Sequence, residues 1–456
     1  MNQNYVEAQR YSQRWIDLIH KPSLSESEAK KIIEESKENF ARHFNRGWLE
    51  YRKSITEAGD WAATEWTGTG AIFRDVLDRE FIDCLGGYGL LNLGWSHPHV
   101  VETVRAQLNR TPMPTQELID PLRGVLARLM ALITPGDIQY SFFVASGTET
   151  IEGALKLAKL YTKKPGFIAA VKAFHGKTMG SLSMIGKSDY REPVGLLYCG
   201  PVYHVPFGDA DAVERQLETC KKIGIGIAGV LMEPIQGEAG AIVPPEDFWP
   251  RLRELTKHYG ALLLADEVQT GLGRTGKLWG VDHWNVVPDI LSVAKSLGGG
   301  VMPIGAFCST AEIWQVMMEP NPFIHTTTTG GGALACSAAI AAIEVTLRER
   351  LWEQAEQKGN YLIARLKSLA AQYPAIFASI TGRGLLIGMH FHSTEIGYRV
   401  AAGLFKRGVL VAATLISAHT IRIEPPLIIT YEQMDTILNR LEDTLCEINR
   451  TLGGKS

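Results

Sequence analysis

The sequence has few cysteines, no long apolar segment and no block of basic residues, and each absence excludes a class of protein. Only six cysteines occur in 456 residues, scattered and without a C-x-x-C pair. That usage is typical of reduced thiols in a cytoplasmic protein, not of a disulfide framework. The twelve histidines include no H-E-x-x-H pattern, so no metal site is predicted.

The N-terminus and the charge balance exclude further classes. The first fifteen residues are polar and lack the apolar core of a signal peptide. No uncharged apolar run reaches the roughly 18 residues that a membrane span requires. The nearest approach, residues 333–347, carries Glu344. A formal net charge of −3 offers no basic surface to nucleic acid or to a membrane.

Three stretches with different patterns divide the chain. Residues 1–60 combine mixed charge with helical periodicity, and Ser23 and Ser25 are candidate N-caps. Residues 61–335 alternate short apolar runs with helical stretches, a pattern that predicts an α/β domain with a mostly parallel sheet. Residues 336–456 hold long helices, short strands and a terminal helix over about 431–451, which indicates a smaller α+β domain.

Six apolar runs in the central stretch are expected to be buried strands. They cover residues 140–144, 166–171, 227–232, 261–265, 289–294 and 304–309. In a parallel sheet, functional groups gather at the carboxyl ends of the strands. The residues that follow these runs are therefore the candidates for a site.

A glycine pattern over residues 271–276, G-L-G-R-T-G, matches the dinucleotide fingerprint but lacks its context. Such a fingerprint must open a helix, whose amides bind the pyrophosphate. The residues that follow hold Gly280 and Pro288 and have weak helical periodicity. Chance matches are common in a chain with 45 glycines, so a nicotinamide site is not predicted.

Two strand ends carry side chains suited to catalysis. Asp266 follows the run 261–265, where an isolated acid is more simply a solvated residue leaving a strand. Lys295 follows another apolar run and precedes three glycines. A lysine there is desolvated, so its pKa falls and its amine becomes nucleophilic. The alternative is a lysine whose stem is buried and whose ammonium reaches the surface.

Two further strand ends are suited to bind a ligand. Ser146, Gly147 and Thr148 stand where a strand meets a long helix. The amides of a helix N-terminus suit a phosphate, although an ordinary helix cap has the same sequence. Phe174 and His175 follow the run 166–171. A flat side chain there stacks on an aromatic cofactor, unless it belongs to the core.

Together these residues fit pyridoxal 5′-phosphate. Glu233, with Gln236 and Glu238 just beyond it, adds a carboxylate at another strand end. The cofactor requires a phosphate cradle, a stacking ring, a lysine that holds it, and a carboxylate that keeps its pyridine nitrogen protonated. Asp266 is the predicted partner of that nitrogen.

The order of the motifs resembles the class III aminotransferases, which have the aspartate aminotransferase-like fold (fold type I). The motifs are SGTE (146–149), FHG (174–176), EPIQGE (233–238), LLLADEVQTGLGRTG (262–276), AKSLGGG (294–300), HTTTTGG (325–331) and IRIEPP (421–426). The resemblance spans roughly residues 60–450. It implies a large cofactor-binding α/β domain and a smaller C-terminal α+β domain.

The resemblance also implies a role for each candidate residue. Lys295 would hold the cofactor and later move a proton, and Asp266 would pair with the pyridinium nitrogen. Gln269 would hydrogen-bond the hydroxyl of the cofactor ring. The other implied cofactor-binding residues are Ser146, Gly147, Thr148, Phe174, His175 and Glu233, with Thr328 reaching the phosphate of the neighbouring subunit. The active unit would therefore be at least a homodimer.

Two residues would bind the substrate. Arg422 would bind a carboxylate of the keto acid, with Glu238 as its switching partner. The alternative is a structural pair between Arg422 and Glu424. One departure concerns the segment 328–333, which reads T-T-G-G-G-A where the family usually has Thr-Phe-Gly-Gly-Asn-Pro. The change is expected to loosen the turn and widen the partner side of the pocket.

The implied activity is transfer of an amino group from a primary diamine, such as putrescine or cadaverine, to 2-oxoglutarate. Other donors stay open, namely ornithine, acetylornithine or a monoamine. An aminomutase would share the same residues, and a cofactor-binding regulator would keep them without turnover. Intact Lys295, Asp266 and Arg422 argue against the regulator.

Overall fold

The computed structural model describes residues 3–47, 49, 63–195 and 200–453, which form two compact units. Unit 1 comprises residues 1–68 and 73–81, and unit 2 comprises residues 69–72 and 82–456. The division into parts 1–60, 61–335 and 336–456 stays a prediction.

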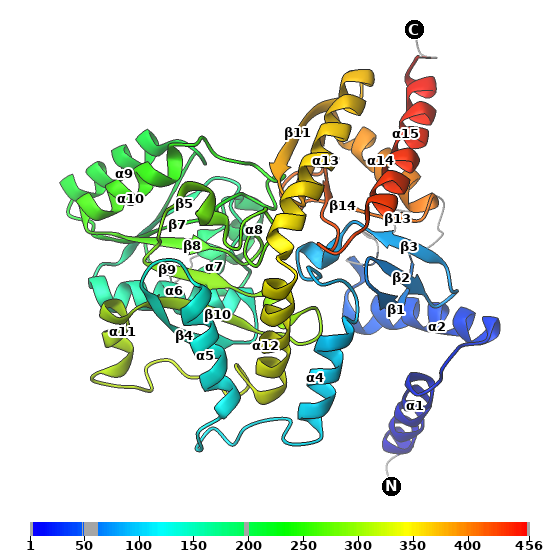
Figure 1. The fold of residues 1–456 in the computed structure, drawn as a ribbon, viewed down its shortest axis with the longest axis horizontal. Helices are drawn as coiled ribbons and strands as arrows, with labels where there is room; N and C mark the ends of the chain where they lie inside the picture. Colours follow the sequence, from blue (N-terminus) through cyan, green and yellow to red (C-terminus); the bar gives the residue numbers. More distant parts are fainter. Residues whose placement is uncertain (1–2, 48, 50–62, 196–199, 454–456) are drawn as a thin grey trace. The chain divides into compact units, whose positions relative to one another are not determined.

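Unit 1 contains the N-terminal helices and most of three short strands, coloured blue in Figure 1. Its elements are α1 (Gln3–Ile19), α2 (Glu26–Asn39), the π-turn η1 (Phe40–Phe44), β1 (Glu65–Thr69), β2 (Ile72–Asp75) and β3 (Glu80–Asp83). Ser25 caps α2 in a capping box with Glu28, so this predicted cap is confirmed. Ser23 precedes the cap position, and its predicted role is wrong.

The large sheet of unit 2 has seven strands in the order β4-β10-β9-β8-β7-β5-β6 (Figure 1). The strands are β4 (Ile138–Val144), β5 (Gly166–Ala170), β6 (Val202–Val205), β7 (Ile227–Met232), β8 (Leu262–Asp266), β9 (Ile290–Val293) and β10 (Gly305–Thr310). Strand β10 runs in the opposite direction to the other six strands of this sheet, which are parallel to one another. The predicted mostly parallel sheet is confirmed, and all six predicted runs form strands. Burial is wrong for the run 140–144, because β4 lies at an edge of the sheet and is only partly buried, with Tyr140 exposed. β6 at the other edge is an addition.

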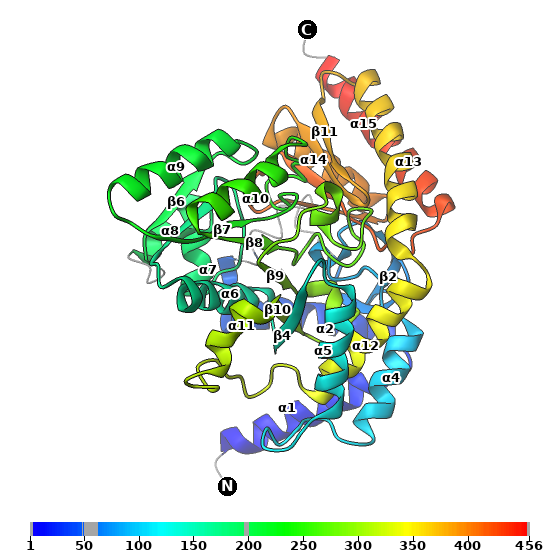
Figure 2. The same ribbon diagram turned by 60° about the vertical axis from the view of Figure 1, so that its left-hand side comes forward.

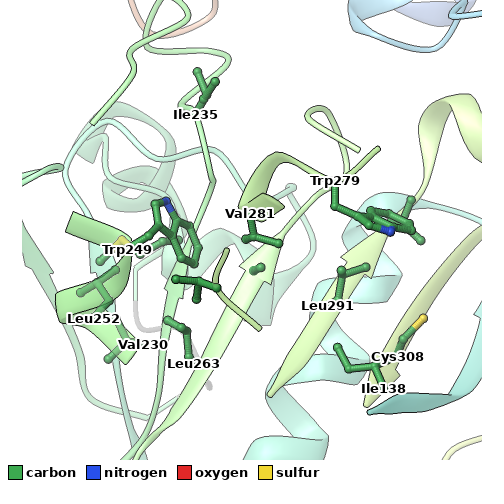
Figure 3. Packing of buried hydrophobic residues seen from close by; sticks show 14 of the residues in the cluster. Ile138, Val230, Ile235, Trp249, Leu252, Leu263, Trp279, Val281, Leu291 and Cys308 are labelled. Carbon is green, nitrogen blue, oxygen red and sulfur yellow. The ribbon is translucent and has the colours of Figure 1, made fainter. Parts of the chain in front are cut away.

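Helices cover both faces of this sheet because alternate side chains of each strand point to opposite faces. Leu263 belongs to a buried cluster that includes residues of α5 (Pro121–Ile133), α9 (Ala210–Lys222), α10 (Phe248–Tyr259) and α12 (Ala333–Arg348). Its neighbour Leu264 belongs to another cluster, which includes residues of α6 (Gly147–Thr162), α7 (Met179–Met184) and α11 (Ala311–Met318). Figure 3 shows part of the first of these clusters, including Trp249 and Leu252 of α10 and Val230 of β7. The loops at the strand ends therefore lie on a rigid, well-packed layer.

A second sheet carries the C-terminal strands in the order β11-β12-β15-β14. Its strands are β11 (Phe377–Arg383), β12 (Leu386–Phe391), β14 (Ala412–Ala413) and β15 (Thr420–Ile423), while β13 (Val409–Leu410) pairs with the end of β3. Helices α13 (Leu351–Gln372), α14 (Thr394–Lys406) and α15 (Tyr431–Gly453) pack with these strands (Figure 1). The predicted terminal helix is confirmed.

The remaining elements of unit 2 are short except for one. They are η3 (Gly86–Tyr88), α4 (Pro98–Leu108), α8 (Ser188–Arg191), η4 (Glu192–Val194), η5 (Gly280–Trp284) and η6 (Lys295–Gly298). Helix α4 lies beside α12, with α5 on the other side of α12 (Figure 2).

The glycine pattern at 271–276 is a packed turn and opens no helix. Gly273 and Gly276 have φ of +98°, and both lie against the backbone of α13 at Trp352 and Glu356. Between them, the buried Arg274 donates to the carbonyls of Leu385 and Pro425. The turn therefore joins the segment after β8 to the C-terminal sheet, and the exclusion of a dinucleotide site agrees with it.

We expect Gly153→Ala to destabilise the protein by about 1–3 kcal/mol, the usual cost of overpacking. An added Cβ on α6 would overlap the ring of Phe307, which is fully buried on β10. The matched control is Gly397→Ala in α14, where a Cβ meets its nearest neighbours at 3.5 Å. Because alanine is the better helix former, the control should gain up to about 1 kcal/mol. Urea unfolding checks both, and equal shifts would contradict the packing argument.

Candidate active site

A pocket of about 190 Å³ lies at the carboxyl ends of the parallel strands. The parallel register brings the ends of β4, β5, β7, β8 and β9 to one edge of the sheet. The predicted site residues that line the pocket are Gly147, Thr148, Phe174, His175, Glu233, Asp266, Gln269 and Lys295. Gly176, Ile235, Val268 and Thr270 complete the wall. A pocket smaller than the roughly 300–1,000 Å³ typical for drug-sized ligands suits a compact molecule.

Asp266 is held in one orientation at the end of β8. Its Oδ2 atom lies 2.7 Å from Nδ1 of His175, and its Oδ1 atom accepts from the amide of Val268 at 3.1 Å. The side chain is 5% exposed, so water screens its charge weakly. The Nε2 atom of His175 has no hydrogen-bond partner within the described part of the chain. The pair places a carboxyl group in a fixed orientation in the pocket wall.

Glu233 supports the pocket in a way that the sequence did not reveal. Its carboxylate accepts from the amide of Phe174 at 3.1 Å and from the amide of Gly237 at 3.0 Å. Burial raises the pKa of Glu233 to about 7, and the nearby Asp266 adds to the rise while His175 opposes it. Glu233 therefore fixes the backbone on which the aromatic ring of Phe174 is mounted.

Lys295 lies at the start of η6, directly after β9, and is strained. Its φ of +47° is in the left-handed region, which residues with a side chain rarely adopt. Such strain persists where the surrounding structure imposes it, and it concentrates at functional sites. Burial lowers the pKa of Lys295, although Glu424 and Glu238 oppose the shift. The neutral, nucleophilic amine is favoured by this position.

The amino end of α6 forms the polar side of the pocket. Ser146 is the N-cap of this helix and accepts from the amide of Glu149, so its side chain supports the helix and is absent from the pocket wall. Thr148 Oγ1 lies 2.7 Å from the hydroxyl of Thr178 and 2.7 Å from that of Ser181. The aligned amides of a helix N-terminus attract an anion such as phosphate.

Gly147 has a steric reason to be glycine. A Cβ at this position would lie 2.8 Å from Cγ1 of Val268, closer than real Cβ atoms approach other heavy atoms. The bare backbone lets the start of α6 contact the turn after Asp266. The anion-binding end of the helix is thereby brought into the same pocket wall as that carboxylate.

Arg422 lies between two carboxylates and is 1% exposed. Its Nη2 atom is 2.8 Å from Oε1 of Glu238, and its Nε atom is 3.9 Å from Oε2 of Glu424. Within the residues that the structure describes, Nε and Nη1 have no hydrogen-bond partner, and Nη2 has only its contact with Glu238. Burial opposes the charge, but Glu238 and Glu424 outweigh it and raise the pKa of Arg422. The result is a buried cation whose hydrogen-bonding capacity is largely unused.

Two residues near Arg422 were not predicted as parts of the site. Glu424 also accepts from Nε2 of Gln269 at 2.8 Å, which links the arginine to the pocket wall. The ring of Tyr88 lies 5.1 Å from the guanidinium carbon. Glu424 was visible in the motif IRIEPP, two positions after the arginine on the same strand face. Tyr88 gave no signal, since it precedes the arginine by most of the chain.

Thr328 is exposed and lies outside the pocket wall. Its carbonyl accepts from Nε2 of Gln116 at 2.6 Å, and Arg123 donates to the nearby carbonyl of Gly331 at 3.3 Å. The role of Thr328 at a neighbouring subunit stays a prediction. In the described residues, no three His, Cys, Asp or Glu side chains are grouped to hold a metal ion.

Comparisons with known proteins identify relatives of this chain. The family model "Aminotransferase class-III" matches residues 61–445. The chain is 47% identical to the putrescine aminotransferase of Pectobacterium atrosepticum over 453 residues, which cover 98% of this chain and 96% of that one.

Solved structures with the same fold include enzymes of related activity. An ornithine aminotransferase from Toxoplasma gondii superposes with a TM-score of 0.80 at 28% identity, covering 94% of this chain and all of that one. An amine transaminase from an uncultivated Pseudomonas species, in its PLP-bound form, gives a TM-score of 0.78 at 28% identity, covering 86% of this chain and 97% of that one.

We expect borohydride reduction with pyridoxal phosphate bound to label Lys295 alone, because its amine is buried in the pocket with a lowered pKa. Peptide mass mapping locates the label. Lys177 is the natural internal control, since it is close in sequence to Phe174 but lies over the rings of Phe174 and Tyr190, outside the pocket wall. A label on Lys177 or Lys172 would show that Lys295 is not the reactive amine.

Proposed function

The chain belongs to the class III aminotransferases, and from that membership we propose that it transfers an amino group from the diamine putrescine to 2-oxoglutarate. The products are an aminoaldehyde and glutamate. The observation that carries the proposal is the 47% identity to a putrescine aminotransferase over nearly the full length of both chains. The ornithine aminotransferase from Toxoplasma gondii is more distant, at 28% identity.

The enzyme is a pyridoxal-phosphate-dependent transaminase, and the residues of the pocket fit that cofactor. Lys295 would hold it covalently, and Asp266 would face its ring nitrogen. The amides at Gly147 and Thr148 would bind its phosphate at the N-terminus of α6, and Phe174 would stack on its ring. The fit rests on a buried amine, a fixed carboxylate and an anion-binding helix end within one pocket wall.

The other cofactor residues would act at the edges of the pocket. Gln269 would hydrogen-bond the ring hydroxyl through its side-chain oxygen, because its Nε2 atom already donates to Glu424. His175 would sit beside the ring and hold Asp266 through the 2.7 Å contact. Glu233 would act through the backbone of Phe174, and Ser146 would act by capping α6.

When bound, the cofactor supplies a carbonyl that takes up the amino group and a ring that accepts electrons. The protein supplies the proton transfers. Nζ of Lys295 would remove the proton from the carbon that bears the amino nitrogen, since burial favours its neutral, basic form. Asp266 would stabilise positive charge on the ring nitrogen with little reorganisation, because both of its oxygens are already held.

The pair formed by Arg422 and Glu238 would let one pocket bind two substrates of opposite charge. A diamine that reacts at one end keeps an ammonium at the other, because aliphatic amines titrate near the lysine value of about 10.4. The acceptor 2-oxoglutarate carries two carboxylates instead. Glu238 would mask Arg422 while the diamine reacts, and it would release Arg422 to bind a carboxylate bidentately. The unused hydrogen-bonding capacity of the guanidinium supports this switch over a purely structural pair.

A panel of amino donors, each with 2-oxoglutarate, tests the proposed substrate. We expect putrescine to give the highest kcat/KM, followed by cadaverine, with ornithine, acetylornithine and monoamines far below. A donor carboxylate would meet Glu238 in its masking position, and like charges repel in a buried site. Faster turnover of ornithine would reassign the donor. Turnover without any keto acid would instead indicate an aminomutase.

We expect Arg422→Ala to weaken use of 2-oxoglutarate by about 10- to 100-fold, since a charged hydrogen bond contributes roughly 1.5–3 kcal/mol. The putrescine half-reaction, followed by cofactor absorbance, should change only a few-fold. Glu238→Gln should slow mainly the diamine half.

Two variants control this experiment. Arg422→Lys keeps the buried charge but loses the bidentate fork, so it separates lost recognition from lost folding. Arg365→Ala removes an exposed arginine of α13 that pairs with Asp435, and it should leave both halves unchanged. Equal losses in both halves for Arg422→Ala and Arg422→Lys would mean that the arginine is structural.

We also propose a homodimer whose active sites are shared. Apolar side chains are exposed on two neighbouring segments, among them Leu118, Phe323 and Ile119, which is 97% exposed. The hydrogen bond from Gln116 to the carbonyl of Thr328 joins these segments. Exposed apolar patches of this kind mark interaction surfaces. A second copy of the chain bound there would bring Thr328 to the neighbouring phosphate.

Co-expression of Lys295→Ala with Thr328→Ala chains tests the shared site. Hybrid dimers would contain one site with both lesions and one with neither, so part of the activity should return. Mixing Lys295→Ala with Asp266→Asn chains is the matched control, because two lesions from the same subunit's wall leave every hybrid site defective. Recovery equal to that control would contradict sharing.

We propose that the protein is cytoplasmic. The cysteines that the structure describes, Cys84, Cys220, Cys308, Cys336 and Cys446, are all free thiols, which agrees with a reducing compartment. Of the helices in the described ranges, none is both long and apolar enough to cross a membrane.

A further inference from the structure

One face of the C-terminal sheet carries more than Arg422. Strands β12 and β15 are antiparallel, with Gly388 opposite Arg422 and His390 opposite Thr420. Residues two apart on a strand point to the same face. His390, Thr420 and Arg422 therefore project from one face, and His390 is partly buried there.

The loop that carries Glu238 lies against this face. The carbonyl of Gly240 accepts from the hydroxyl of Thr381 at 2.7 Å and lies 3.1 Å from Nε2 of His390. That nitrogen is also 2.8 Å from the hydroxyl of Thr381. A Cβ on Gly240 would lie 2.6 Å from Cε1 of His390, so loop and ring are in direct contact. The imidazole holds the backbone two residues after Glu238.

The hydrogen bonds around His390 have one consistent direction. If Thr381 donates its proton to Gly240, then Nε2 of His390 must donate to the same pair of oxygens. Nδ1 then accepts from the hydroxyl of Thr420 at 3.0 Å, and Thr420 in turn accepts from Ser417 at 2.9 Å. Burial lowers the pKa of His390, which favours the neutral imidazole, and these contacts assign its proton to Nε2. Both ring nitrogens are therefore engaged.

The loop needs an external restraint because its turn is strained. Gly240 has a φ of +115°, and Ala241, which carries a side chain, has a φ of +56°. Left-handed backbone at such residues is maintained by surrounding contacts. The hydrogen bonds of His390 also extend to a second loop that contacts Glu238. Ser417 belongs to that loop, and the amide of Leu415 in the same loop donates to Oε2 of Glu238 at 2.8 Å.

We propose that His390 is a positioning residue for Glu238. By holding the carbonyl of Gly240, His390 keeps the loop fixed, so that only the Glu238 side chain moves when Arg422 is masked or released. Without it the masking position is less well defined, and the arginine is more often available to an anion. The inference rests on the proposed charge switch and adds the residue that sets its balance.

Two substitutions of His390 separate its two hydrogen bonds. His390→Gln keeps an N–H near the position of Nε2, toward Gly240. His390→Asn keeps a polar atom only near Nδ1, toward Thr420. The control is His392→Asn, since His392 is exposed just beyond β12 and contacts the carbonyl of Pro374 instead. Should His390→Asn fail to fold, Thr381→Val removes the other donor to the same carbonyl and takes its place.

Both halves of the switch are measured separately. Stopped-flow absorbance gives the putrescine half-reaction, and calorimetry gives the affinity for glutarate, a dianion that does not react. His390→Asn should slow the first by about 3- to 10-fold, the factor typical of one buried hydrogen bond. It should tighten glutarate binding by about 2- to 5-fold, on the same reasoning. His390→Gln and His392→Asn should stay within about twofold of wild type.

A double-mutant cycle decides whether His390 acts through Glu238. In a Glu238→Gln background, His390→Asn should cause no further loss in the amine half and no further gain in glutarate affinity. An undiminished effect in that background, or weaker glutarate binding by His390→Asn, would overturn the proposal. If putrescine proves not to be the donor, the glutarate arm still tests His390, whereas the donor panel tests the function.

Discussion

The constraint on which the active site depends is the parallel register of the large sheet. Met232 pairs with Ala265 and Asp266 pairs with Ser292, so β7, β8 and β9 end side by side. Glu233 follows the end of β7, Asp266 is the last residue of β8, and Lys295 stands two residues after the end of β9. Because β10 is antiparallel to both β4 and β9, β4 keeps the parallel direction and brings the start of α6 to the same edge. One hydrogen-bonding pattern thus collects an amine, two acids and an anion-binding helix end.

Collecting these groups away from water makes their charge states depend on their neighbours. Burial is the largest cause of the shifts of two groups in the pocket: it lowers the pKa of Lys295, and with the nearby Asp266 it raises that of Glu233 to about 7. Backbone amides offset the cost of burying two of the carboxylates, because they donate hydrogen bonds to Glu233 and to Glu267. Glu267, the neighbour of Asp266, thereby stabilises the turn at Gly280 and Val281. Of these two acids, only Asp266 lines the pocket.

The sequence was sufficient for residues whose roles follow from a strand end and insufficient for those that depend on packing. Asp266 and Lys295 follow mainly apolar runs, so their place at the carboxyl edge of the sheet could be predicted, whereas the sequence around each residue left its burial open. Strand β6 was not predicted because it is only half-buried and has no long apolar run. The break between α12 and α13 lies at Arg350, with a φ of +49°, among good helix formers. The partnership of Glu238 with Arg422 came only from the family resemblance, because it joins two sheets across much of the chain.

The division of labour between those two sheets has a consequence for how such an enzyme diversifies. The groups that we propose to contact the cofactor follow strands of the seven-stranded sheet, whereas Arg422 and His390 lie on β15 and β12 of the other sheet. On that proposal, substitutions in the C-terminal sheet can change which amines and keto acids are accepted while Lys295 and Asp266 keep their places at the edge of the large sheet. Selection for a new donor, in nature or in a directed-evolution library, has its shortest route through that smaller sheet.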